Sequence, residues 1–234
     1  MIGYYDYTVL LTYFSLISAT TGIIASLSGT GHPYIGVFFL LFCGLCDAFD
    51  GKVARTKKNR TEREMKFGIQ IDSLSDLVAF GVLPGAIGSA LIRVNPALTE
   101  SPLKCEKRFD FVMTILLFGI ILIYALAALI RLAYFNVTEE ERQQTEGGVR
   151  STYVGLPVTS SALIFPTIML LQFVTRDFDL TWLYFVMMFL TAYLFLAKFN
   201  IRKPGLRGIL IMVAIGVAEA IALLVCSYFF KLKP

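Results

Sequence analysis

Residues 33–54 read PYIGVFFLLFCGLCDAFDGKVA, a nearly continuous apolar run with two aspartates close to its end. A helix needs about 20 consecutive apolar residues to cross the hydrocarbon core of a bilayer, and this run has that length. Similar runs occupy residues 8–28, 68–92, 110–136, 156–175, 180–198 and 207–230. The sequence therefore predicts an all-α, polytopic transmembrane helical bundle of about seven spans, with six or eight as the alternatives.

The composition of the whole chain agrees with a membrane protein. Of its 234 residues 56% are apolar and 16% are charged, against about 45–50% and about 25% in soluble proteins. The mean hydropathy is +0.70. Because every joint between spans is too short to bury a core, we expect a single integral-membrane domain over residues 1–234. Any functional site must then lie among the helices.

Other features argue against different classes of protein. The N-terminus has no basic region and no cleavage site of small residues, so residues 9–27 are predicted to be the first span and not a signal peptide. No joint combines aromatic residues with a long basic patch, so nucleic acid is excluded as a partner. Cys43 and Cys46 lie within an apolar run, which favours packing over a redox role.

Basic residues indicate which way the bundle faces. Lysine and arginine are enriched in cytoplasmic joints, and this preference also accounts for the net charge of +4. The joint between the second and third spans carries Lys52, Arg55, Lys57, Lys58, Arg60, Arg63 and Lys66. With this joint inside and seven spans, the N-terminus is cytoplasmic and the C-terminus lies outside. We expect an integral protein of a prokaryotic plasma membrane whose site faces the cytoplasm.

Four aspartates in two adjacent spans form the candidate site. Asp47 and Asp50 lie in the last turns of the second span, and Asp72 and Asp76 lie four residues apart in the third. A charged carboxylate costs roughly 2.5–3.5 kcal/mol at the middle of a membrane and needs a partner. Because a short joint makes the two helices antiparallel neighbours, both acidic faces can meet near the cytoplasmic surface. Four clustered carboxylates require cations.

Small residues share the faces of these acids. Gly51 and Ala54 leave room for a ligand, and Arg55 offers paired donors to a phosphate. Gly68 lies on the acidic face of the third span. Mg²⁺ is usually held by a few carboxylates together with substrate phosphates. Two such ions about 3.5–4 Å apart can orient an oxygen nucleophile and stabilise the leaving oxygen of a displacement at phosphorus. The only histidine, His32, falls on the outer side, so a carboxylate is the expected proton acceptor.

Two other interpretations of the acids stay open at this point. The carboxylates could be structural, paired with Arg55 or Lys52 at the membrane edge. They could also belong to a divalent metal-ion transporter, whose acids are expected near the midplane of the membrane. Glycines on the same helix faces, and a position next to a basic joint, favour an enzyme.

The chain resembles the CDP-alcohol phosphatidyltransferases in the pattern Asp47-x-x-Asp50-Gly51-x-x-Ala54-Arg55, then twelve residues, then Gly68-x-x-x-Asp72-x-x-x-Asp76. It is similar to the phosphatidylserine synthase branch of that family in the segments Phe80-Gly81, Arg131-Leu132-Ala133 and Gly155-Leu156-Pro157. The similarity covers roughly residues 10–165, which we expect to form the catalytic core. Additional C-terminal spans are expected at about 180–230.

This resemblance implies transfer of a phosphatidyl group from CDP-diacylglycerol to an alcohol, with release of CMP and with two Mg²⁺ or Mn²⁺ ions as cofactors. It implies that all four aspartates hold metal and that Asp76 also takes the proton of the hydroxyl. The residues implied to contact CDP are Gly51, Ala54, Arg55, Gly68 and, where an asparagine is expected, Ser18. The family commonly forms homodimers.

The acceptor alcohol depends on residues outside this signature. Serine needs a cation for its carboxylate and a polar or acidic partner for its ammonium group. The candidates for acceptor or phosphate binding are Arg131, Asn136 and Arg150. With the branch motifs, they favour L-serine and the product phosphatidylserine. Another small alcohol, or an archaeal CDP-ether lipid as donor, is the alternative.

Two expectations concern the surroundings of the acceptor residues. Arg131 is deep enough in the fourth span that it could instead pair with an aspartate of the cluster or with Glu219. The acidic joint of residues 138–153 is a candidate lid over the acceptor site.

Overall fold

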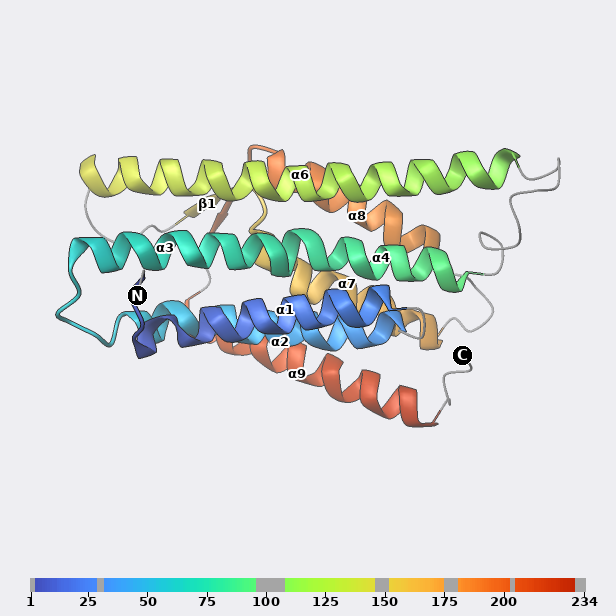
Figure 1. Ribbon diagram of the computed structural model, residues 1–234, viewed down its shortest axis with the longest axis horizontal. Helices are drawn as coiled ribbons and strands as arrows, with labels where there is room; N and C mark the ends of the chain where they lie inside the picture. The colour runs from blue at the N-terminus through green and yellow to red at the C-terminus, as the bar shows by residue number, and fades with distance from the viewer. Residues whose placement is uncertain are drawn as a thin grey trace.

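The computed structural model describes residues 3–28, 32–95, 108–145, 152–174, 181–202 and 205–229. These residues form a bundle of helices that lie roughly along one axis (Figure 1). The helices are η1 (Tyr7–Val9), α1 (Leu10–Leu27), α2 (Pro33–Ala54), α3 (Glu62–Asp76), η2 (Leu77–Val82), α4 (Leu83–Val94), α6 (Arg108–Thr145), η4 (Val158–Ser160), α7 (Ser161–Val174), α8 (Thr181–Leu196) and α9 (Leu206–Phe229). Two short strands, β1 (Thr152–Val154) and β2 (Asn200–Arg202), pair with each other.

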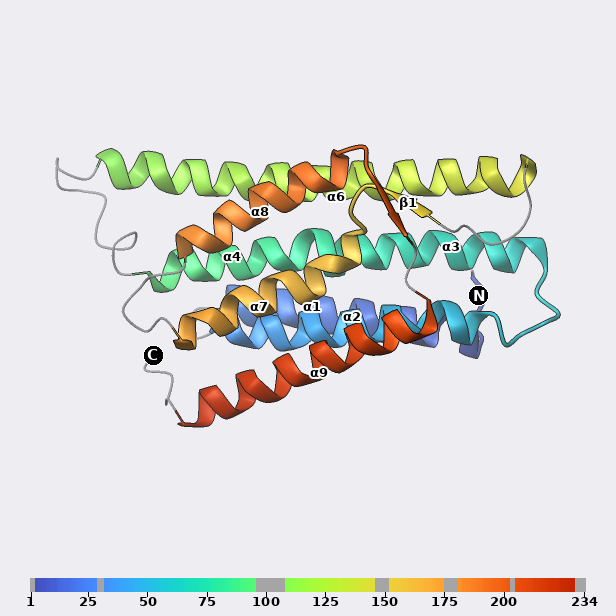
Figure 2. The ribbon, with the colours of Figure 1, turned by 180° about the vertical axis from the view of Figure 1, so that it is seen from behind.

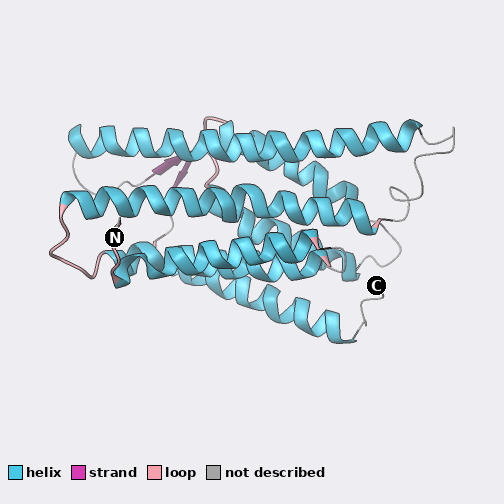
Figure 3. Ribbon diagram, in the orientation of Figure 1, coloured by secondary structure: helices cyan, strands magenta, loops and turns pink. Residues whose placement is uncertain are grey.

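Five helical segments within the described ranges are long and apolar enough to cross a membrane. They are Tyr7–Leu27, Pro33–Ala54, Glu62–Val94, Val112–Arg142 and Leu206–Cys226. Val158–Gln172 and Thr181–Leu196 are shorter apolar helices. These segments correspond to the seven apolar runs of the sequence, and the predicted all-α polytopic bundle is confirmed. Helix accounts for most of the ribbon in Figure 3.

Two helices extend beyond their predicted spans. The predicted span 68–92 begins earlier, at Glu62, because a capping box supports a polar first turn. In this box the hydroxyl of Thr61 accepts from the amide of Glu64, whose carboxylate accepts from the amide of Thr61. Similarly, α6 continues past the predicted end at 136 to Thr145. Hydropathy detects only the apolar part of such helices, so it missed their polar turns.

The helices α1 and α2 form the most extensively packed pair. A Cβ added at Gly22 would lie 2.7 Å from Cβ of Phe39, so only glycine allows this close approach. On the same interface the hydroxyl of Ser18 donates to the carbonyl of Phe39 at 3.1 Å. The pair brings the start of α1 to the end of α2, at the left of Figure 1, where α3 also begins.

The segments α3, η2 and α4 follow one another without a break, and η2 is a π-helical turn directly after Asp76. Pro84 has no amide hydrogen, so it cannot donate to the carbonyl of Phe80. The hydroxyl of Tyr124 on α6 donates to that carbonyl at 2.7 Å. The hydroxyl of Tyr184 on α8 donates to the carbonyl of Pro84 at 2.8 Å. Both tyrosines are fully buried. Hydroxyl groups from two distant helices thus donate hydrogen bonds to backbone carbonyls at this irregular segment.

The shorter helices α7 and α8 lie on the side of the bundle seen in Figure 2. The connections at their ends form the β1–β2 ladder, in which Tyr153 lies opposite Ile201. The sequence did not indicate these strands, which are too short to have a pattern. Gly155 follows β1 with φ of +77°, and a Cβ there would lie 2.9 Å from the carbonyl oxygen of Ala197. Glycine is therefore required at this position.

A charged contact joins the N-terminal segment to the basic joint. The ammonium group of Lys57 lies 2.7 Å from the carboxylate of Asp6 and 3.0 Å from that of Glu64. The hydrogen bond from Lys57 lowers the pKa of Asp6 to about 2. The side chain of Asp6 also caps η1 by accepting from the amide of Thr8 at 2.8 Å. This contact holds η1 beside the joint between α2 and α3.

Candidate active site

The structure brings the four predicted aspartates together on two facing helices. Asp47 and Asp50 come from α2, and Asp72 and Asp76 from α3. The carboxyl groups of Asp50 and Asp72 lie near enough to each other to interact. Asp47 and Asp76 are close enough to interact electrostatically with this pair. Carboxylates at such separations repel each other unless a proton or a cation lies between them.

Among the residues that the structure describes, no lysine or arginine compensates this charge. Within the described parts of the chain, none of the four aspartates forms an ion pair with a basic side chain. The ammonium group of Lys52 instead lies 5.0 Å from the ring centroid of Phe49. The guanidinium of Arg55 folds back toward Gly51. The interpretation in which Lys52 or Arg55 neutralises the acids therefore has no support in this geometry.

A cavity of about 530 Å³ lies next to the acids. Asp50 and Asp72 line it, whereas Asp47 and Asp76 are not among its lining residues. Asp76 is only 8% exposed. The volume falls within the range of about 300–1,000 Å³ that is typical of small-molecule sites. Two of the four acids thus line a space that a ligand can enter, and the other two lie outside its lining.

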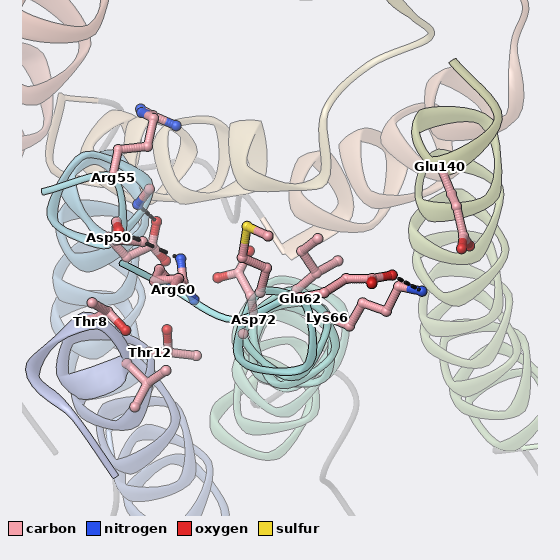
Figure 4. A pocket seen from close by; sticks show the side chains of 15 residues that line it. Thr8, Thr12, Asp50, Arg55, Arg60, Glu62, Lys66, Asp72 and Glu140 are labelled. Atoms are coloured by element: carbon pink, nitrogen blue, oxygen red, sulfur yellow. Dashed lines mark hydrogen bonds and ion pairs between the residues drawn. The ribbon is translucent and has the colours of Figure 1, made fainter. Parts of the chain in front are cut away.

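The cavity collects most of the residues predicted to contact CDP. Gly51, Ala54, Arg55 and Gly68 all line it. Its other walls come from the start of α1, from the joint between α2 and α3, and from the extended end of α6 (Figure 4). Residues that are far apart in the sequence thus surround one space at one end of the bundle.

Ser18 is the exception among those predicted residues. It lies in a separate groove between α1 and α2, where its hydroxyl bonds to the carbonyl of Phe39. It is not among the residues that line the cavity of the acids. Thr8 and Thr12, one turn apart, line that cavity in its place. Their position at the start of the first span was a signal that the sequence interpretation did not use.

Two further cavity residues were also missed by the sequence interpretation. Arg60 comes from the joint and Glu140 from the end of α6. The sequence places both in charged segments that look like ordinary solvated surface. Glu140 is far from the four aspartates along the chain, and only the packing of α6 brings it to the cavity. Arg60 is close to them in sequence, but only the path of the joint shows that it turns toward the cavity.

The predicted acceptor residues are connected to neighbouring elements. Arg131 is buried, and its Nε donates to the carbonyl of Leu156 at 3.0 Å. Asn136 bonds to Ser73, which directly follows Asp72, with 2.8 Å between Nδ2 of Asn136 and Oγ of Ser73. Arg150 lies outside the described residues, as does part of the predicted lid, whose residues 138–145 belong to α6.

The alternative partners of Arg131 are not used. In the described structure Arg131 forms no ion pair with the four aspartates or with Glu219. The carboxylate of Glu219 instead accepts from the hydroxyl of Thr167, and its second oxygen is buried without a partner. Arg131 therefore links α6 to the Gly155-Leu156-Pro157 segment, which joins two motifs that are distant in the sequence.

The donor chemistry of the cluster fits a hard divalent cation. Among the described side chains, no three acids, histidines or cysteines converge as a ready-made metal cage. Four carboxylates without basic partners nevertheless provide the oxygen ligands that Mg²⁺ and Mn²⁺ prefer. Mg²⁺ usually completes such sites with water and with substrate phosphates, for which the adjoining cavity has room.

Comparison with known proteins agrees with this site. The family model described as CDP-alcohol phosphatidyltransferase matches residues 8–194. A Saccharomyces cerevisiae protein named CDP-diacylglycerol–serine O-phosphatidyltransferase is 32% identical over 163 residues, which cover 68% of this chain and 51% of that protein. Proteins of the same name from Helicobacter pylori and Mycobacterium bovis are 26% identical over 152 residues and 25% identical over 156 residues.

The matches cover only part of each relative's sequence. The Helicobacter pylori match covers 64% of this chain and 53% of that protein, and the Mycobacterium bovis match covers 66% and 46%. The chain thus spans about half the length of the curated relatives it matches. No solved structure gives a significant match. The family model, by contrast, covers most of the chain, including both acidic helices and the cavity they form. The protein therefore belongs to the CDP-alcohol phosphatidyltransferase family.

Proposed function

We propose that this protein transfers the phosphatidyl group of CDP-diacylglycerol to the hydroxyl of L-serine, forming phosphatidylserine and releasing CMP. The observation that carries the proposal is the cluster of four aspartates at the edge of a cavity lined by Gly51, Ala54, Arg55 and Gly68. The names of the matched relatives, which all specify serine, support this acceptor.

The reaction needs a cationic environment for a diphosphate beside four acids. We infer that Asp47, Asp50, Asp72 and Asp76 hold two Mg²⁺ or Mn²⁺ ions. Such ions, when bound, neutralise phosphate charge and stabilise the leaving oxygen. Asp50 and Asp72 line the cavity and are proposed to face the substrate, while Asp47 and the buried Asp76 complete the cluster outside the cavity lining. Arg55 adds a positive charge at the cavity wall.

In the proposed reaction the acceptor hydroxyl attacks the phosphorus on the lipid side of the diphosphate. The bond from this phosphorus to the bridging oxygen breaks, CMP leaves with that oxygen, and the hydroxyl proton passes to Asp76. Asp76 is buried and borders the π-helical turn. His32 caps the opposite end of α2 and cannot serve the same site. Arg131 and Asn136 are proposed to bind or position the acceptor from α6.

The serine assignment is tested by offering the purified protein a choice of acceptors. We expect that CDP-diacylglycerol with Mg²⁺ or Mn²⁺ gives CMP and phosphatidylserine with L-serine, at a higher rate than with inositol phosphate, glycerol phosphate or choline. Mass spectrometry of the lipid and assay of CMP provide the measurement. If another alcohol outpaced serine, the acceptor assignment would be wrong while the transferase assignment stood. The absence of CMP with every alcohol would contradict both.

The metal proposal predicts that chelation stops CMP release and that added Mg²⁺ or Mn²⁺ restores it. Asp47→Asn and Asp72→Asn should each lower turnover by about 100-fold or more, because each removes a charged ligand. Asp110→Asn, near the start of α6 and away from the site, is the matched control and should behave as the parent. Near-normal turnover of both aspartate variants in saturating metal would contradict the proposal. Metal flux into proteoliposomes without CDP-lipid would favour a transporter.

The role of Asp76 predicts a difference between binding and turnover. Asp76→Asn should lower kcat by about 10²–10⁴-fold, the usual range for loss of a general base. The affinity for CDP should fall much less, because the other three carboxylates remain. Steady-state kinetics and direct titration with CDP measure the two effects. Equal losses in both would identify Asp76 as an ordinary metal ligand.

We also propose that the end of the bundle with the cavity faces the cytoplasm, because the basic joint lies there. In a background without other cysteines, Asn59→Cys should react with a membrane-impermeant thiol reagent only after cells are opened. Val94→Cys, in the last turn of α4 at the other end of the bundle, is the matched control and should react in intact cells. Labelling of the Asn59 variant from outside would reverse the orientation.

A further inference from the structure

Arg60 is the basic residue that points into the cavity. It lies in the joint between α2 and α3 and is half-buried. In Figure 4 its side chain enters the space between Asp50, Thr12 and Asp72, whereas the side chain of Arg55 points away from that space. The arginine of the sequence signature is thus at the wall, and an arginine outside the signature occupies the interior.

The guanidinium of Arg60 has unused capacity to donate. Its Nη1 donates to the carbonyl of Ala54 at 3.5 Å, and its Nη2 donates to the carbonyl of Glu64 at 3.3 Å. Both distances exceed the usual range for an N–H···O hydrogen bond. The Nε atom is buried and has no partner in the described structure. A guanidinium carries five N–H donors, so one on each of the two terminal nitrogens remains for a ligand.

No carboxylate occupies these donors. Among the described residues Arg60 forms no ion pair, although Asp50 and Asp72 line the same cavity. Arg60 bonds to Glu64 only through the backbone carbonyl of Glu64. The carboxylate of Glu64 instead accepts from Lys57 and from the amide of Thr61. The charge of Arg60 is therefore available to an anion that enters the cavity.

The absence of a side chain at Gly68 leaves the space that the guanidinium of Arg60 occupies. A Cβ added at Gly68 would lie 2.6 Å from Nη2 of Arg60. Any larger residue would therefore displace the end of the arginine side chain. Gly68 lies one turn before Asp72 on the same helix, so this place is next to the acidic cluster. In this chain the signature glycine thus leaves room for a cation beside the acidic cluster.

A diphosphate ester is the ligand that matches this arrangement. Its oxygen atoms accept paired hydrogen bonds from a guanidinium, and its charge is repelled by carboxylates unless cations lie on its other sides. We propose that Arg60 binds the diphosphate of the cytidine donor from a position beside Asp50 and Asp72. This inference rests on the proposed function in that it takes a CDP ester as the donor, but it is independent of the acceptor.

Direct titration of the detergent-solubilised protein with cytidine, CMP and CDP, in the presence of Mn²⁺, tests the role of Arg60. We expect Arg60→Gln to weaken CDP binding by about tenfold or more, the scale of a lost charge-assisted pair. Cytidine, which has no phosphate, should bind with nearly unchanged affinity. Arg60→Lys should lie between the two, because it keeps the charge and loses the fork. Arg63→Gln, an exposed change in the same region, is the matched control.

The two possible failures are distinguishable. If Arg60→Gln weakened cytidine and CDP equally, or changed neither, Arg60 would be only a clamp on the joint and the inference would be wrong. Thermal unfolding of each variant identifies a loss of fold, and Gly68→Ala gives a second displacement of the guanidinium with Arg60 retained, which should also weaken CDP more than cytidine. If CDP binding depended on Arg60 but serine gave no product, the acceptor proposal would fall and this inference would stand.

Discussion

Four carboxylates held close together near one end of a membrane-spanning bundle impose the constraint on which the rest of this structure depends. Such a cluster is unfavourable without cations, and the described lysines and arginines do not pair with it. The helices α2 and α3 fix the positions of the acids, while the cavity leaves space for whatever brings the compensating charge. The four carboxylates therefore do not stabilise the folded bundle by themselves, and their position suits the binding of a cationic ligand.

The remaining elements hold these two helices in register. The π-helical turn after Asp76 departs from regular geometry, and the buried hydroxyls of Tyr124 and Tyr184 bond to backbone carbonyls at or next to it. Asn136 contacts α3 beside the acids, and Arg131 connects α6 to the segment after β1. Each of these contacts joins helices that are separated by long stretches of sequence. The helix α8 thus supports the site without lining its cavity, whereas α6 does both.

The polar ends of the helices line the cavity, although hydropathy does not identify them as parts of the helices. The capped first turn of α3 and the extension of α6 project beyond the apolar spans, and both contribute cavity walls. The joint between α2 and α3 likewise carries Arg60 into the cavity, although the sequence presents it as a basic loop that only orients the protein in the membrane. Basic residues that are predicted to set the topology therefore also line the cavity at this end of the bundle.

The sequence by itself determined the bundle and the acidic cluster, because hydropathy and helical periodicity depend only on residues close together in the chain. Apolar length defined the spans, and spacings of three and four residues placed the aspartates and glycines on common faces. Only the tertiary structure decided that Ser18 packs against Phe39 away from the cavity, that Thr12 and Arg60 line it, and that two short strands pair behind it. These features depend on which distant atoms meet, and no local pattern contains that information.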